Sequence, residues 1–84
     1  MSQADEIRCF IGHRYIGGSR EKGLKQIRVR PGDVHNEMEL INVMPNVCNA
    51  MRGGKLLLMC GITIAKIESP PRGLGANFYV TYNL

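Results

Sequence analysis

The sequence predicts a small α+β domain in which helices come first and a β-hairpin closes the chain. Apolar residues recur at helical spacing near the N-terminus, and two stretches in the middle, bounded by Gly and Pro, have the length of short helices. The last third alternates apolar and polar residues as strands do. With 84 residues, 44% of them hydrophobic, and no repeat or linker, we expect a single domain, 1–84, with one small core.

The first predicted element is a helix over about residues 3–16. Ile7, Phe10, Ile11 and Tyr15 lie at helical spacing and share one face. We expect the Gly-Gly-Ser segment 17–19 to end or bend this helix, because glycine is unfavourable inside helices.

A short strand is predicted over residues 26–30. Ile27 and Val29 alternate with Arg28 and Arg30, and Pro31 stops the pattern. The strand therefore has a basic outer face.

The second helix is predicted from Val34 to about Ile41. Asp33 stands at its expected N-cap, where a carboxylate accepts hydrogen bonds from free backbone N–H groups. Val34, Met38 and Ile41 would then face the core.

The third helix is predicted to run from a cap at Asn42 to the Gly-Gly pair 53–54. Pro45 is tolerated in its first turn, where its missing N–H has no acceptor in the helix. Three apolar residues share its inner face, and three polar ones look outward: Val47, Ala50 and Met51, against Asn46, Asn49 and Arg52.

The hairpin is predicted from two strands, one within 56–68 and one over 77–82. Ile62 and Ile64 alternate with Thr63 in the first strand, and the Pro- and Gly-rich segment 69–75 can be neither helix nor strand. In the second strand Phe78, Val80 and Tyr82 share one face.

This order of elements resembles the winged helix-turn-helix domain. The stretch from Gly32 to Arg52 resembles a helix-turn-helix, and it is more loosely similar to segments of prokaryotic defence and regulatory proteins. The resemblance covers nearly the whole chain. It implies a small regulator or defence-associated protein that places its third helix in the major groove of duplex DNA and touches the backbone with its hairpin loop.

The resemblance also implies which side chains meet DNA. Asn46 and Asn49 suit adenine, because an amide donates and accepts at once, and Arg52 suits guanine or a phosphate. Five further cations are expected to contact the duplex at the wing tip or along the phosphates: Arg72, Lys55, Arg28, Arg30 and Lys25. The net charge of +4 favours a polyanionic partner, with basic segments on either side of an acidic one over 33–51.

Other functional classes find little support in the sequence. The start lacks the layout of a signal peptide and no apolar run is long enough to span a membrane, so we expect a cytoplasmic protein. Cys9, Cys48 and Cys60 are expected to be reduced and mostly buried, and no pair of cysteines has zinc-site spacing. We expect no metal, no cofactor and no enzymatic activity.

One alternative from a different class stays open. A small adaptor or self-associating module on the same kind of scaffold would bind another protein, with the strand at 77–83 and Tyr79 as contact points at a sheet edge. Under either hypothesis we expect a homo-oligomer, in the simplest case a dimer.

Overall fold

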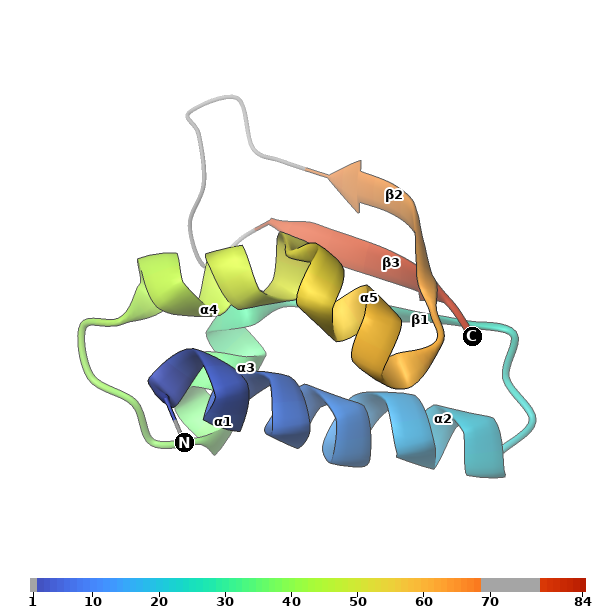
Figure 1. Ribbon diagram of the computed structural model, residues 1–84, viewed down its shortest axis with the longest axis horizontal. Helices are drawn as coiled ribbons and strands as arrows, with labels where there is room; N and C mark the ends of the chain where they lie inside the picture. The colour runs from blue at the N-terminus through green and yellow to red at the C-terminus, as the bar shows by residue number, and fades with distance from the viewer. Residues whose placement is uncertain (1, 69–77) are drawn as a thin grey trace.

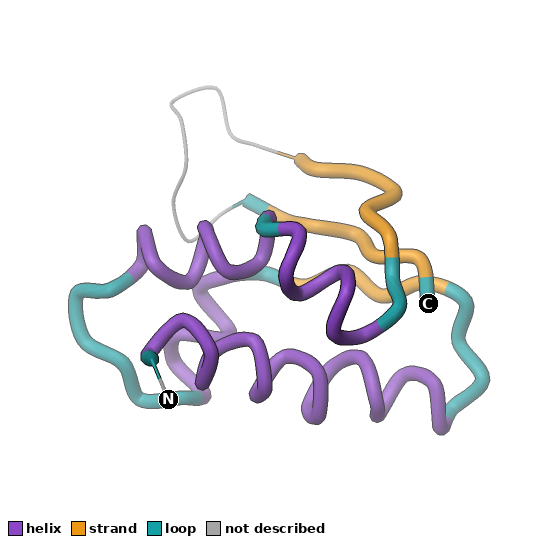
Figure 2. Tube along the Cα trace, in the orientation of Figure 1, coloured by secondary structure: helices purple, strands orange, loops and turns teal. Residues whose placement is uncertain are grey.

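Helices gather on one face of a three-stranded antiparallel sheet in the computed structural model, which describes residues 2–68 and 78–84 (Figure 1). The fold is therefore α+β, as predicted. Figure 2 separates the helical layer from the strands, and the core lies between them. Within the described residues, none of the helices has the length and apolar character that crossing a membrane requires.

The first helix is longer than predicted. α1 (Gln3–Ile11), a π-helical segment η1 (Gly12–Gly17) and α2 (Gly18–Glu21) follow one another without a break and form a single rod in Figure 1. The side chain of Ser2 caps the start by accepting a hydrogen bond from the backbone N–H of Asp5 at 3.2 Å.

The prediction that Gly17 and Gly18 end or bend this helix is wrong. Both glycines have ordinary helical backbone angles, and the helix ends only where Gly23 adopts a φ of +75°. The reason is tertiary packing, since Ile16 and Ser19, on either side of the pair, are buried against the rest of the core. Burial there offsets the intrinsic cost of glycine in a helix.

Strand β1 (Gln26–Val29) forms as predicted, and α3 (Pro31–Glu37) follows at once. The N-cap of α3 is Arg30, not Asp33, because Pro31 takes the first helical position. Asp33 lies inside the first turn and pairs with Arg30, with 2.8 Å between Nη2 and Oδ1. The predicted extension to Ile41 is also wrong: Glu39 has a φ of +56°, which ends the helix and leaves Ile41 79% exposed.

Helix α4 (Met44–Arg52) confirms the predicted third helix, although its N-cap is Val43. Asn42 does not cap it but adopts a φ of +55° in the preceding turn. The predicted inner face is confirmed, and Cys48 joins the three residues expected to be buried there.

The chain then departs from prediction, because residues 54–60 form a helix, α5 (Gly54–Cys60), rather than the start of a strand. Leu56, Leu57, Leu58 and Met59 are unbranched at Cβ and favour helix, whereas the β-branched residues begin only at Ile62. Extended backbone at Gly53, with φ −74° and ψ 148°, separates α5 from α4.

The sheet is completed by β2 (Thr63–Glu68) and β3 (Tyr79–Asn83), in the order β1-β3-β2. The prediction that the last strand lies at an edge is wrong, because β3 is hydrogen-bonded on both sides and the edges are β1 and β2. Phe78, Val80 and Tyr82 are buried against the helices, as predicted.

Candidate functional site

Helix α4 carries the clearest polar surface among the predicted site residues. Asn46, Asn49 and Arg52 recur every three residues on its outer side and are exposed, and Lys55 continues the same surface into the first turn of α5. We call these four residues the α4 strip. The opposite side of α4 packs on α1 and α3.

Two hydrogen bonds fix how the strip presents its polar groups. The Asn46 Nδ2 donates to Gln3 Oε1 at 2.9 Å, which ties the start of α4 to the first turn of α1. The Arg52 Nη2 donates to Asn49 Oδ1 at 3.3 Å, so two neighbouring side chains of the strip are already aligned. The strip therefore offers amide and guanidinium groups that are partly preorganised.

The rotation of α4 is set from the core. The Tyr82 hydroxyl donates a buried hydrogen bond to the Met51 carbonyl at 2.6 Å. This bond links the central strand to the last turn of α4, where the carbonyl has no partner within the helix. The outward direction of Arg52 follows from that anchor.

Within the described ranges of the chain, the two cations of the α4 strip are not held in ion pairs. Neither Arg52 nor Lys55 forms an ion pair with a carboxylate among the residues that the structure describes. Lys55 lies near Asp5, whose pKa is lowered by a hydrogen bond from Ser2, by Arg8 and by Lys55. Asp5 is itself paired with Arg8.

The predicted phosphate contacts on the first strand lie elsewhere. Arg28 stands on the sheet face opposite the buried Val29, 3.4 Å from Glu68, and its guanidinium stacks on Tyr79 with Cζ 3.7 Å from the ring centre. Arg30 is paired with Asp33. Both charges are already compensated, and neither residue shares a surface with the α4 strip.

Two predicted residues are not brought to the strip. Lys25 belongs to the α2–β1 connection, which lies at the opposite end of the molecule from α4 (Figure 1). Arg72 lies outside the described residues. The structure thus groups Asn46, Asn49, Arg52 and Lys55, and separates them from Lys25, Arg28 and Arg30.

The cysteines are free thiols: Cys48 is buried, and Cys9 and Cys60 are half-buried. Burial raises the pKa values of the Cys48 and Cys60 thiols. Across residues 2–68 and 78–84, His, Cys, Asp and Glu side chains do not gather in threes that could hold a metal ion.

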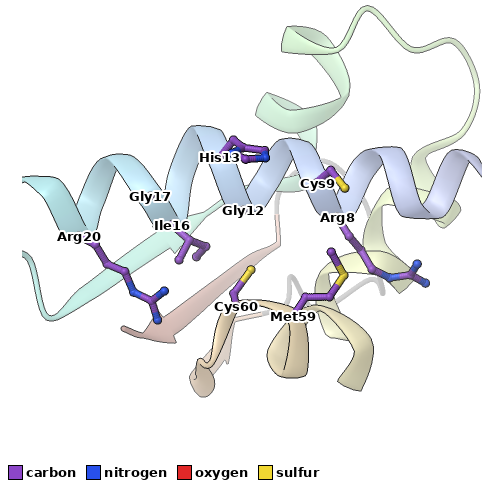
Figure 3. A pocket seen from close by; sticks show the side chains of 9 residues that line it. All are labelled: Arg8, Cys9, Gly12, His13, Ile16, Gly17, Arg20, Met59 and Cys60. Carbon is purple, nitrogen blue, oxygen red and sulfur yellow. The ribbon is translucent and has the colours of Figure 1, made fainter. Parts of the chain in front are cut away.

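Sequence reasoning missed two surfaces. On α5, Leu58 is 87% exposed and Met59 55% exposed, which a strand assignment could not show. A pocket of about 280 Å³ also opens between the first helix and α5 (Figure 3). A recurrence of Arg8, Gly12, Ile16 and Arg20 at every fourth position could have revealed it.

Comparisons with protein-family models, curated proteins and solved structures find no match.

Proposed function

We propose that this domain binds duplex DNA through the α4 strip, in the manner of a winged helix. The supporting observation is that α4, whose inner side is buried in the core, presents two amides and the cation Arg52 on its outer side, and that Lys55 in the first turn of α5 adds a second cation to the same surface. The chain order of helix, strand, helix, helix and hairpin, with sheet order β1-β3-β2, agrees with a winged-helix arrangement. The extra helix α5 is a departure from the element order expected from the sequence.

The chemistry of the strip fits the major groove. An α-helix with its side chains is about 10–12 Å across, which fits the major-groove width of about 12 Å, and the nine residues of α4 extend about 13 Å along the groove. Asn46 and Asn49 would read base edges, and Arg52 would reach guanine or a phosphate. Lys55, one turn further on, would contact a phosphate and add affinity without reading sequence.

A small regulator or defence-associated protein acting as a homodimer is the biological role we infer from this mode of binding. Two copies would read half-sites about one helical turn of DNA apart, as helix-turn-helix dimers do.

The test is a fluorescence-anisotropy titration of the full chain against a labelled mixed-sequence duplex. Two phosphate contacts per domain give a log–log salt slope of about −1.8, so affinity should fall roughly tenfold between about 50 and 200 mM salt. Arg52→Ala should make the slope shallower by about 0.9 per domain. No binding at the lower salt concentration would contradict the proposal.

Arg28→Ala is the matched control, because it removes the same charge from the other face of the sheet, where Glu68 already compensates it. We expect its salt slope to equal that of the unchanged protein. An equal loss in both variants would show that binding follows net charge and not the α4 strip.

A second candidate function is self-association or protein binding. The exposed Leu58 and Met59 on α5 favour it, since apolar side chains grouped on a surface mark protein contacts. The central position of β3 excludes strand addition at the strand that the sequence suggested, so the exposed apolar residues of α5 are the contact surface we favour. Size-exclusion chromatography with light scattering distinguishes the two functions, because a tight oligomer that ignores DNA would favour this one.

A further inference from the structure

The pocket beside α5 is built almost entirely from one side of the first helix. Seven residues of that helix and two of α5 line its volume of about 280 Å³ (Figure 3): Arg8, Cys9, Gly12, His13, Ile16, Gly17, Arg20, Met59 and Cys60. It lies between the first helix and α5 and shares no residue with the α4 strip.

The π-helical segment explains how so many residues share one face. In an α-helix, residues four apart drift around the axis because a turn takes 3.6 residues. In η1 the i→i+5 hydrogen-bond pattern places more than four residues in each turn, so residues four apart rotate in the opposite direction and the drift is cancelled. Arg8, Gly12, Ile16 and Arg20 therefore stay aligned along the pocket, and π-helical turns of this kind occur frequently at functional sites.

Glycine at position 12 lets α5 approach this helix closely. A Cβ atom on Gly12 would lie 3.2 Å from the Cys60 Sγ, tighter than an ordinary contact. The thiol of Cys60 thus rests against bare backbone and closes one wall of the pocket (Figure 3).

Among the described residues that line the pocket there is no carboxylate, and the permanently charged side chains are those of Arg8 and Arg20. Arg8 is paired with Asp5, and its buried Nε finds no hydrogen-bond partner among the described residues. Arg14, on the same helix outside the pocket, is paired with Glu37. Arg20 alone among the arginines of this helix has no carboxylate partner in the described part of the chain, and its Nη2 donates only to the Gly61 carbonyl at 3.3 Å.

The rest of the lining is apolar or electrically neutral. Ile16 forms the floor, and Met59 and Cys60 form the α5 wall. Burial raises the pKa of the Cys60 thiol, against an opposite effect of Arg20, so the thiol remains protonated and leaves the Arg20 charge uncompensated.

We propose that this pocket binds a small organic carboxylate with a compact apolar body. The carboxylate accepts hydrogen bonds from the free guanidinium N–H groups of Arg20, a geometry in which arginine pairs bidentately. The body lies between Ile16 and Met59. The volume of about 280 Å³, just below the usual range of about 300–1,000 Å³ for ligand pockets, admits a molecule about the size of benzoate. One uncompensated arginine matches a single negative charge better than a phosphate dianion. The proposal does not depend on DNA binding.

The test is a ¹H–¹⁵N NMR titration of the full chain with benzoate, with benzamide as the neutral isostere and inorganic phosphate as the anion without an apolar body. We expect benzoate to shift the amides of Gly12, Gly17 and Cys60 with a dissociation constant on the order of 1 mM. Benzamide and phosphate should each bind at least fivefold more weakly. Shifts away from the pocket, or equal binding of either comparison compound, would overturn the proposal.

Two pairs of variants locate the ligand. Arg20→Gln should weaken benzoate at least fivefold, whereas Lys22→Gln, an exposed charge just past the end of α2, should stay within twofold. Met59→Trp should fill the pocket and abolish binding, whereas Leu24→Trp, at an exposed site outside the lining, should leave it unchanged.

Both altered pocket residues have exposed side chains, so we expect these variants to fold, and circular dichroism checks that they do. Folded Arg20→Gln or Met59→Trp that still binds benzoate as the unchanged protein does would overturn the proposal. No DNA is present in the titration, so its failure says nothing against the α4 strip, and failed DNA binding says nothing against the pocket.

Discussion

Helices α4 and α5 are neighbours in the chain, separated only by Gly53, yet they use their apolar residues in opposite ways. α4 is sharply two-sided, with every apolar residue from Val47 to Met51 buried and its polar residues outside. α5 buries Leu56 but leaves Leu58 and Met59 exposed. The core thus takes up all the apolar residues of α4 from Val47 to Met51, but only part of the apolar surface of α5.

This difference shows which residues of the two helices stabilise the fold and which are free to contact a partner. A helix with one fully buried side contributes to the free energy of unfolding through that side and leaves its other side free for polar recognition. A helix with apolar residues outside retains apolar surface that the fold does not use. Substitutions on the buried side of α4 should therefore lower the free energy of unfolding, and substitutions at the exposed residues of α5 should leave it nearly unchanged.

The largest effect is expected from a pair of methionines, one in each helix. Met51 is fully buried, so Met51→Ala should lower the free energy of unfolding by about 2–4 kcal/mol through lost contacts and a cavity. Met59→Ala should change it by less than about 0.5 kcal/mol, because that side chain is half in solvent. Urea unfolding followed by circular dichroism measures both, and equal losses would break the comparison.

A smaller loss is expected from the strand anchor of α4. Tyr82→Phe removes the hydroxyl that donates to the Met51 carbonyl and leaves a buried acceptor without its partner. The cost should be about 1–2 kcal/mol in the same unfolding experiment. α5 has no such bond to the sheet among the described contacts, and a loss below about 0.3 kcal/mol would show that packing alone orients α4.

The same tyrosine predicts a dependence on alkaline pH. Burial raises the pKa of Tyr82 above its ordinary value of about 10, so the folded state holds the proton more tightly than the unfolded chain. This contribution to stability is complete below about pH 10 and is lost as the pH rises further. Tyr82→Phe should therefore lose less stability than the unchanged protein between about pH 9 and 11. Tyr15, whose pKa is raised by burial and by Glu37, keeps some dependence in both proteins.

The spacing of apolar residues correctly predicted the elements in which tertiary packing agrees with the local preference for helix or strand. β1, α4 and the buried face of β3 follow directly from alternation and helical spacing. The pattern failed at Gly17 and Gly18, where burial of Ile16 and Ser19 carries a helix through two glycines. It failed again at Leu56, because a short apolar run does not distinguish helix from strand.

The candidate site was only partly visible in the sequence. Helical spacing identified Asn46, Asn49 and Arg52, since one face of one helix is a local property. The ion pairs that compensate some of the cations are not a local property, because Arg28 pairs with Glu68 and Arg14 pairs with Glu37, residues far apart in the sequence. The pocket beside α5 depends on where α5 packs and on the π-helical turns, neither of which the residue pattern specified.

The smallest effects are expected at the connections that enter α4 and leave α5. Gly61 ends α5 with φ 63° and ψ 44°, a left-handed conformation in which glycine avoids the strain of a side chain. Gly61→Ala should lower the free energy of unfolding by about 1 kcal/mol. Glu39 adopts a similar φ of +56° in the turn before α4 but carries a side chain. Glu39→Gly should raise stability by about 0.5 kcal/mol, because relief of strain exceeds the greater flexibility of glycine in the unfolded chain.

A matched control for the glycine substitution lies in α1. Glu6 is exposed and helical, so Glu6→Gly should lower the free energy of unfolding by about 1 kcal/mol. Opposite signs for the two Glu→Gly changes would show that backbone conformation, not loss of a carboxylate, decides the outcome. A loss at Glu39 as large as the loss at Glu6 would mean that the turn is not strained. The entry to α4 would then be as relaxed as the glycine exit from α5, and the two helices would differ only in their exposed faces.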